Sequence, residues 1–286
     1  MQSSLTHLEC SRCGSKVDAD QVAQLCDVCG SPLLARYDLE AVSARLAKGD
    51  LRGRPPSLWR YGELLPVRDR ANLVTLGEGM TPLVPVPRLG RKVGIPDLLV
   101  KDEGVIPTGT FKARGAAVGV SRAKELGVTS LAMPTNGNAG GAWAAYCAAA
   151  GISAHIVMPR AAPVVCRAEC VAAGAQLHLV DGLIGDAGAI VGRAVARYGW
   201  LDASTLKEPY RVEGKKTMAL EIGEQLRWRL PDAIVYPAGG GVGIIGLQGP
   251  SGNEGSGLGI RRHAAPRCRA IDRVRSDRPG LRAGTA

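Results

Sequence analysis

A single lysine, Lys112, stands where an apolar run gives way to a helix-like segment, within the stretch GVIPTGTFKARG from Gly104 to Gly115. A lysine at the start of a helix lies near the positive end of the helix dipole and here also near Arg114, and both disfavour its ammonium form. A neutral amine can attack a carbonyl carbon and form a Schiff base. A lysine taken alone is usually a solvated residue on a first helical turn, so the other motifs of the chain must decide.

Two further turns of small and polar residues each follow a strand-like run. PTNGNAGG, from Pro134 to Gly141, offers free amides, the hydroxyl of Thr135 and the carboxamides of Asn136 and Asn138 at a helix start, which suits a carboxylate or a phenolic oxygen. YPAGGGVGI, from Tyr236 to Ile244, has glycines that let successive amides converge on a phosphate. It lacks the GxxxxGK[ST] pattern of a nucleotide loop and the acidic residue of a dinucleotide site.

The three turns together offer one partner to each reactive part of pyridoxal 5'-phosphate. The lysine suits its aldehyde, the asparagine turn its ring hydroxyl and the glycine loop its phosphate. A glycine cluster on its own is a plain loop as often as a binding site, so the prediction depends on all three turns together.

Two CxxCG motifs near the start predict a metal site. CSRCG begins at Cys10 and CDVCG at Cys26, so the four cysteines Cys10, Cys13, Cys26 and Cys29 form two knuckles. Four thiolates at this spacing form a tetrahedral zinc site of the ribbon type, which is structural because it has no open coordination position. The alternative is a set of unligated thiols, and a ribbon on its own would also be consistent with partner or nucleic-acid binding.

The elements that position these turns alternate as strand, turn and helix from Leu98 to Leu247. Such a rhythm predicts an α/β fold with a parallel sheet covered on both faces, and ligands in such sheets bind beyond the carboxyl ends of the strands. An additional amphipathic helix is expected from Tyr37 to Leu51. The expected strands are 98–101, 130–134, 154–158, 176–180 and 233–236, and the expected helices are 110–126, 138–150, 163–173, 185–198 and 213–230.

Charge and composition argue against nucleic-acid and membrane partners. The net charge is +10, but half of the excess lies from Gln248 to Ala286, and the rest of the chain has no stripe of lysine and arginine with interleaved aromatic residues. No apolar run approaches the length of a membrane span. The first residues lack the basic and apolar start of a secretory signal, so we expect a cytoplasmic protein whose thiols are reduced.

The stretches LGEGMTPL, KDEGVIPTGTFKARGA, PTNGNAGG, YRVEGKKTMALEI and YPAGGGVGIIGL closely resemble threonine synthases. These enzymes belong to the pyridoxal-phosphate fold-type II family, with tryptophan synthase β, cysteine synthase and threonine dehydratase. The resemblance covers roughly Tyr37 to Leu247 and implies parallel sheets in two lobes. It divides the chain into a zinc ribbon (1–36), a catalytic region (37–247) and a tail (248–286).

The resemblance also assigns residues. Lys112 matches the Schiff-base lysine, and Asn138 matches the asparagine that binds the ring hydroxyl. Thr135 and Asn136 match the turn that holds the substrate carboxylate. Lys215 and its neighbour Lys216 are candidates for the substrate's own phosphate, with a solvated helix start as the alternative. The phosphate loop of the cofactor matches Gly239, Gly240, Gly241, Val242 and Gly243.

The implied reaction converts O-phospho-L-homoserine and water into L-threonine and phosphate. Other fold-type II activities remain as alternatives, of the cysteate synthase, threonine dehydratase or cysteine synthase type, and so does a non-catalytic zinc-ribbon binding protein. The implied partner is therefore a small phosphorylated amino acid, and a homodimer is left open.

The chain departs from the family pattern after Leu247. The continuation is rich in Arg, Gly and Pro without apolar periodicity, so we expect either a disordered tail or a shifted reading frame. With suitably chosen codons, the second frame from Arg262 to Pro279 spells GMPRLAVAQSTGCAPIVR, and QSTGCAPIV is close to how the family continues. The missing segment normally supplies the group that faces the pyridine nitrogen, so we expect the chain as written to be impaired in stability or activity.

Overall fold

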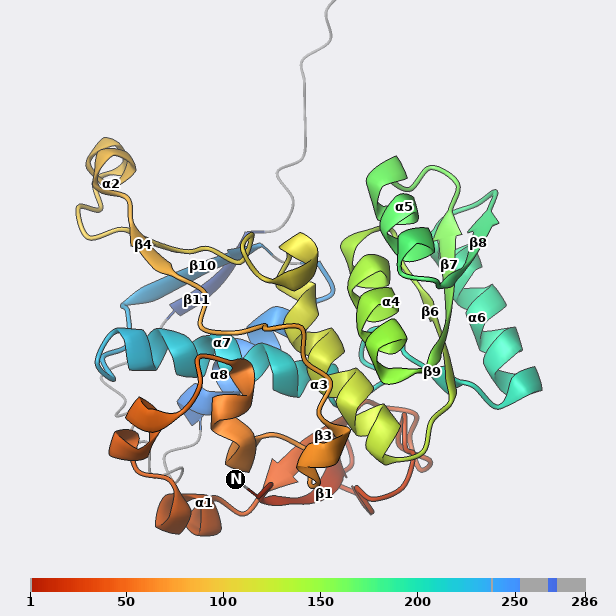
Figure 1. The fold of residues 1–286 in the computed structure, drawn as a ribbon, viewed down its shortest axis with the longest axis horizontal. Coiled ribbons are helices and arrows are strands. Elements are labelled where there is room, and N and C mark those ends of the chain that lie inside the picture. Colours follow the sequence, from red (N-terminus) through yellow and green to blue (C-terminus); the bar gives the residue numbers. More distant parts are fainter. Residues whose placement is uncertain (1, 238, 253–266, 272–286) are drawn as a thin grey trace, which may run out of the picture.

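The computed structural model describes residues 2–237, 239–252 and 267–271, and its helices and strands lie in two lobes on either side of the long helix α3 (Figure 1). α3 (Lys112–Glu125) is the helix that the lysine turn opens, and every residue from Ala113 to Ala123 is buried. Its small residues allow this, because alanine and glycine on all sides let neighbouring helices approach closely. α4 and α7 pack against it, one from each lobe.

One lobe is the predicted α/β unit. Its parallel sheet has the order β8-β7-β6-β9. Helix α6 covers one face, and α4 and α5 lie on the other (Figure 1). The strands are β6 (Ser130–Pro134), β7 (Ser153–Pro159), β8 (Gln176–Val180) and β9 (Leu201–Asp202), and the helices are α4 (Asn138–Ala150), α5 (Val164–Ala172) and α6 (Ile184–Tyr198). The predicted bounds of β6, β8 and α4 are confirmed, whereas the two-residue β9 was not foreseen.

The other lobe departs more from the prediction. β5 (Leu99–Lys101) pairs antiparallel with β4 (Leu83–Pro85) and does not join a parallel sheet. The reason is the short connection through α2 (Pro87–Val93), which returns the chain beside the strand it has just left. Helix α7 (Arg211–Gln225) ends before the predicted Leu230, because Arg227 and Trp228 adopt positive φ angles of 55° and 63°.

The segment expected as one helix from Tyr37 to Leu51 is also interrupted. α1 (Leu39–Arg45) ends at Leu46, whose backbone is extended, and a 3-10 helix follows from Lys48 to Gly53. Further 3-10 turns, which were not predicted, cover Leu58–Leu64, Arg70–Asn72 and Pro107–Gly109.

Beyond Leu247 the expectation of no regular structure was wrong at two places. α8 (Val242–Gly252) continues five residues past Leu247. β11 (Arg267–Ile271) lies parallel to β10 (Ala233–Pro237), residue for residue. The remainder of the predicted tail, 253–266 and 272–286, lies outside the described residues.

The N-terminal segment shares the main hydrophobic core. Its antiparallel sheet has the order β2-β1-β3, formed by β1 (Leu5–Cys10), β2 (Lys16–Val17) and β3 (Leu33–Tyr37). Leu5 and Leu8 lie in the same buried cluster as Val118 and Trp143. The N-terminal sheet therefore shares one core with α3 and α4. Among the described residues, none of the helices is long and apolar enough to cross a membrane.

Candidate active site

Lys112 lies half-buried at the first turn of α3, after a tight turn in which Thr108 and Gly109 have φ angles of 64° and 63°. Its Nζ atom is 3.5 Å from the centre of the Phe111 ring. Burial is the main cause that lowers the pKa of Lys112 to about 8, and the positive charge of Arg211 is the second. The predicted loss of the ammonium form is therefore supported, but Arg114 is not its cause.

Arg114 is bound between two carboxylates instead. Its guanidinium is fully buried and donates to Glu221 at 2.6 and 2.7 Å and to Glu103 at 2.7 and 2.8 Å. Lys101 donates to the same Glu221 carboxylate at 2.8 Å. This network joins β5, α3 and α7, so it fixes the position from which Lys112 projects.

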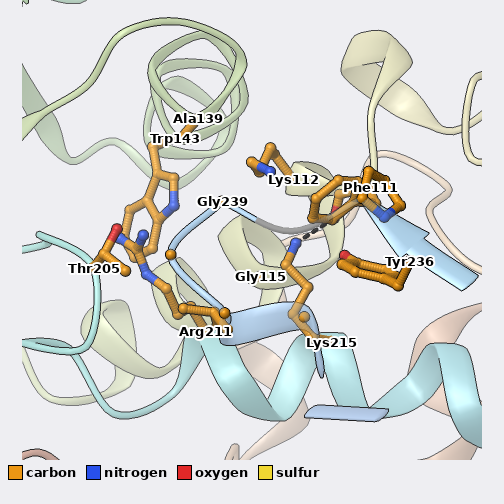
Figure 2. A pocket seen from close by; sticks show the side chains of 15 residues that line it. Phe111, Lys112, Gly115, Ala139, Trp143, Thr205, Arg211, Lys215, Tyr236 and Gly239 are labelled. Carbon is orange, nitrogen blue, oxygen red and sulfur yellow. Dashed lines mark hydrogen bonds between the residues drawn. The ribbon is translucent and has the colours of Figure 1, made fainter. Parts of the chain in front are cut away.

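The glycine loop follows β10 and faces Lys112 across one cavity (Figure 2). Gly241 has a φ angle of 75°, and α8 begins at the next residue. A Cβ atom at Gly240 would lie 3.0 Å from the Thr205 side chain, so a side chain there would crowd the wall. All five predicted loop residues line the cavity, which leaves amides rather than side chains facing it.

Lys215 also reaches the cavity wall. It is 4% exposed, and its ammonium donates to the backbone carbonyl of Phe111, so it is not the solvated lysine of the alternative interpretation. Burial, followed by the charge of Lys112, lowers the pKa of Lys215 well below its ordinary value. Lys216 does not line the cavity, because its ammonium pairs with Glu213.

The polar residues of the asparagine turn, Thr135, Asn136 and Asn138, do not line the cavity. The Thr135 hydroxyl stays within its own turn, bonded to the amide and the carbonyl of Gly137. Asn136 is exposed, and the Asn138 carbonyl oxygen accepts a hydrogen bond from the Cys166 thiol at 3.3 Å. From this helix, Ala139 and Trp143 line the cavity. The assigned roles of Thr135, Asn136 and Asn138 stay predictions.

Sequence reasoning missed several cavity residues. Arg211 is buried at the start of α7, and its guanidinium lies 4.8 Å from the centre of the Trp143 ring. Phe111 and Tyr236 pack edge to face on the opposite wall, with ring centres 5.4 Å apart (Figure 2). The motif YRVEGKKT already contained Arg211, but only the fold shows that this residue is buried and lines the same cavity as Lys112.

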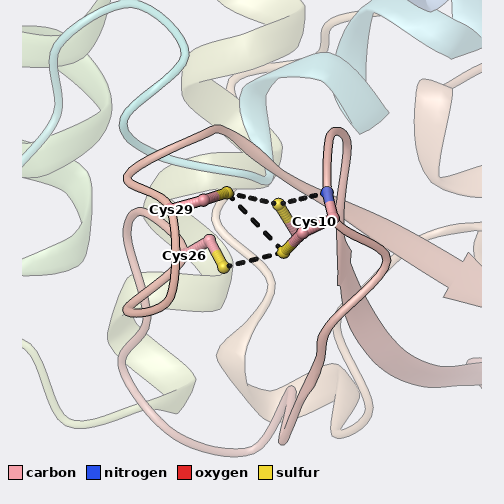
Figure 3. A group of neighbouring side chains, drawn as sticks. Cys10, Cys26 and Cys29 are labelled. Atoms are coloured by element: carbon pink, nitrogen blue, oxygen red, sulfur yellow. Dashed lines mark hydrogen bonds between the residues drawn. The ribbon is translucent and has the colours of Figure 1, made fainter.

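The four predicted cysteines come together at the tip of the ribbon (Figure 3). Their sulfur atoms all lie within 4.8 Å of one another, and two pairs are separated by 3.4 Å (Cys10–Cys29) and 3.6 Å (Cys13–Cys26). Zinc–sulfur bonds of about 2.3 Å place tetrahedral sulfurs roughly 3.8 Å apart. The amides of Arg12 and Cys13 both point at the Cys10 sulfur at 3.4 Å, as the knuckle interpretation requires.

The ribbon touches the elements that carry the cavity. The Tyr210 hydroxyl donates to the Ala19 carbonyl at 3.0 Å, and the Gln24 carboxamide donates to the Asp202 carbonyl at 2.8 Å. Tyr210 precedes Arg211, so the ribbon supports the chain segment from which Arg211 projects.

Curated relatives of this chain are named threonine synthases, the family that its sequence motifs resemble. It is 38% identical over 231 residues to a threonine synthase of Methanocaldococcus jannaschii, covering 80% of this chain and 56% of the relative. It is 38% identical over 242 residues to a threonine synthase of Methanosarcina acetivorans, covering 84% and 58%. The chain thus spans little more than half the length of these relatives.

Solved structures of similar fold include maize serine racemase, with a TM-score of 0.55 at 27% identity, covering 62% of this chain and 54% of that one. An O-ureido-L-serine synthase matches with a TM-score of 0.54 at 28% identity, covering 59% and 55%. These similarities confirm the expected fold-type II architecture.

A family model described as pyridoxal-phosphate dependent enzyme matches residues 74–268. The matched region contains Lys112, the glycine loop and Arg211, and it continues past Leu247, where we had expected the resemblance to end. The chain therefore belongs to the pyridoxal-phosphate dependent enzyme family.

Proposed function

We propose that this chain carries the active site of a threonine synthase, which converts O-phospho-L-homoserine and water into L-threonine and phosphate. The observation that carries the proposal is the placement, in one cavity, of a lysine with a lowered pKa, a glycine loop, and two further buried basic side chains, Arg211 and Lys215. The curated relatives bearing that name support it.

The cavity fits pyridoxal phosphate in two respects. The loop from Gly239 to Gly243 is glycine at every position except Val242, so backbone amides are accessible along it, as a phosphate requires. Lys112 lies across the cavity with an amine that is more readily neutral than an ordinary lysine, so it is the residue that would hold the aldehyde carbon of the cofactor. When bound, the cofactor supplies an electron sink for negative charge developing on the substrate carbons.

The residues of the chain then have distinct tasks. Lys112 moves protons at Cα and then at Cβ of the substrate, since an amine with a pKa of about 8 both accepts and returns protons near neutral pH. The phosphate that leaves from Cγ carries negative charge, and the basic side chains of Arg211 and Lys215 on the wall can donate hydrogen bonds to it. Water adds at Cβ, which completes the balance to threonine and free phosphate.

The four cysteines are proposed to hold one structural Zn²⁺. The distances between their sulfur atoms are close to those in a tetrahedral zinc site. Because protein thiolates would fill all four coordination positions, the ion would contribute to folding rather than to the reaction. Thiolates kept for a metal imply a reducing compartment such as the cytoplasm. In this proposal the ribbon spans 1–36 and the catalytic region 37–247.

The test is phosphate release by the purified chain, supplied with pyridoxal phosphate and O-phospho-L-homoserine. Release with formation of threonine is the expected result. Ammonia formation from L-threonine without phosphate release would instead indicate a dehydratase. Replacing Arg211 by glutamine should raise KM for the phosphorylated substrate by roughly ten- to a hundredfold, the range for a hydrogen bond to a charged group. An unchanged KM would remove Arg211 from the substrate site.

A further inference from the structure

The hydroxyl of Tyr236 is a buried polar group without a partner among the residues that the structure describes. Tyr236 lies on β10, directly before the glycine loop, and only 7% of it is exposed. It lines the cavity, and Figure 2 shows its oxygen directed toward the interior of the pocket. Buried hydroxyls nearly always have hydrogen-bond partners, so an unpartnered one at a cavity wall points to a ligand that supplies the partner.

The geometry of the glycine loop leaves room for this hydroxyl. A Cβ atom at Gly243 would lie 2.2 Å from the Tyr236 oxygen, so any other residue there would displace the phenol. Gly243 belongs to the first turn of α8, where free amides and the helix dipole favour an anion. Gly243 therefore leaves the backbone amides of the loop uncovered and also leaves room for the Tyr236 hydroxyl beside them.

The orientation of the phenol is also fixed. The Phe111 ring packs against Tyr236 at an interplanar angle of 66°, which restricts rotation of the tyrosine ring. Burial, with the nearby carboxylate of Glu103 as the second cause, raises the pKa of Tyr236 well above its ordinary value. The phenol therefore stays protonated at neutral pH and can act as a donor.

We propose that the Tyr236 hydroxyl donates a hydrogen bond to the phosphate group bound at the glycine loop, and so acts as a positioning residue for the cofactor. This rests on the proposed function in one respect, namely that the phosphate belongs to pyridoxal phosphate. The role requires no covalent step.

The experiment compares binding of pyridoxal phosphate and of pyridoxal, which lacks the phosphate, to the full chain and to Tyr236→Phe. A hydrogen bond to a charged group predicts a loss of roughly ten- to a hundredfold in affinity for pyridoxal phosphate and none for pyridoxal. Tyr37→Phe, which removes the same hydroxyl from a half-buried tyrosine at the end of β3, should bind both as the unchanged chain does. Thermal unfolding without ligand should show Tyr236→Phe to be at least as stable, since it loses only an unpartnered group.

Equal affinity of Tyr236→Phe and the unchanged chain for pyridoxal phosphate would overturn the inference, and so would an equal loss for pyridoxal. Inorganic phosphate, followed by phosphorus NMR, separates this inference from the proposed function. Phosphate binding that depends on Tyr236 in a chain that does not bind pyridoxal phosphate would support the anion site and refute the proposed cofactor role. Binding of neither would overturn both.

Discussion

Replacing Lys112 by methionine should stabilise the cofactor-free chain at neutral pH. Methionine keeps the length and the apolar stem of the side chain but removes the charge. The pKa of Lys112 falls from 10.5 to about 8 on folding, chiefly because of burial. At 1.36 kcal/mol per pKa unit, holding the ammonium in the folded state at pH 7 costs about 3 kcal/mol. The contact of the ammonium with the Phe111 ring offsets about 0.5–1 kcal/mol of this cost. Lys112→Met is therefore expected to raise the free energy of unfolding by about 2 kcal/mol.

The pH dependence follows from the direction of the shift. The folded pKa lies below the unfolded one, so between pH 10.5 and pH 8 the unfolded state binds more protons and the penalty grows as the pH falls. The advantage of Lys112→Met should therefore shrink by about 2 kcal/mol between pH 7 and pH 9.5. A catalytic lysine that lowers stability is the expected compromise between activity and stability.

Urea unfolding of the two chains at both pH values measures this directly. Lys92→Met is the matched control, because Lys92 is exposed on α2 and its replacement should change stability by less than about 0.5 kcal/mol. If Lys112→Met is no more stable than the unchanged chain at pH 7, or if its advantage does not vary with pH, the lysine is not held in an unfavourable environment and the reasoning about its neutral form is wrong.

Three further predictions concern the supporting structure. Arg114→Met should lower the free energy of unfolding in urea by about 3–5 kcal/mol, because it leaves Glu103 and Glu221 buried without their partner. Arg160→Met, which breaks an exposed ion pair with Asp181, should leave the urea midpoint unchanged. Treatment with a zinc chelator should speed amide hydrogen exchange in the ribbon and around Asp202 and Tyr210, which the ribbon contacts, but not in β7 and β8. Unchanged hydrogen exchange in the ribbon would argue against a bound metal. Gly79→Ala should destabilise the chain by more than about 1 kcal/mol, because Gly79 has a φ angle of 110° and a Cβ there would lie 2.1 Å from the Leu58 nitrogen. Gly53→Ala is the control, since a Cβ at Gly53 meets no atom within 4 Å. Equal stability of the two variants would contradict the steric argument.

The α/β lobe could be predicted from the sequence because its signals are local. Apolar runs such as Ser130–Pro134 are followed at once by a glycine-bearing turn and an alanine-rich helix, and the structure gives β6 and α4 the expected bounds. The lysine turn and the glycine loop could be predicted for the same reason. Each lies between a strand and a helix, β5 and α3 or β10 and α8, and its glycines mark the turn in the sequence itself.

The parts that could not be predicted depend on contacts between distant residues. Arg211 lowers the pKa of Lys112 from another helix, while Arg114, only two residues from Lys112, turns away to Glu103 and Glu221. The contact of Asn138 with Cys166 joins residues on different helices and is invisible in either motif. The antiparallel pairing of β5 depends on where β4 lies, which hydrophobic periodicity does not specify.

Lys112 is proposed to hold pyridoxal phosphate in the cavity that it shares with the glycine loop. The most direct measurement is the absorbance spectrum of the full chain with added pyridoxal phosphate, compared with that of Lys112→Ala. We expect a visible band of lysine-bound cofactor in the unchanged chain, and we expect Lys112→Ala to lose both this band and phosphate release from O-phospho-L-homoserine. A band of equal strength in Lys112→Ala would contradict the proposal.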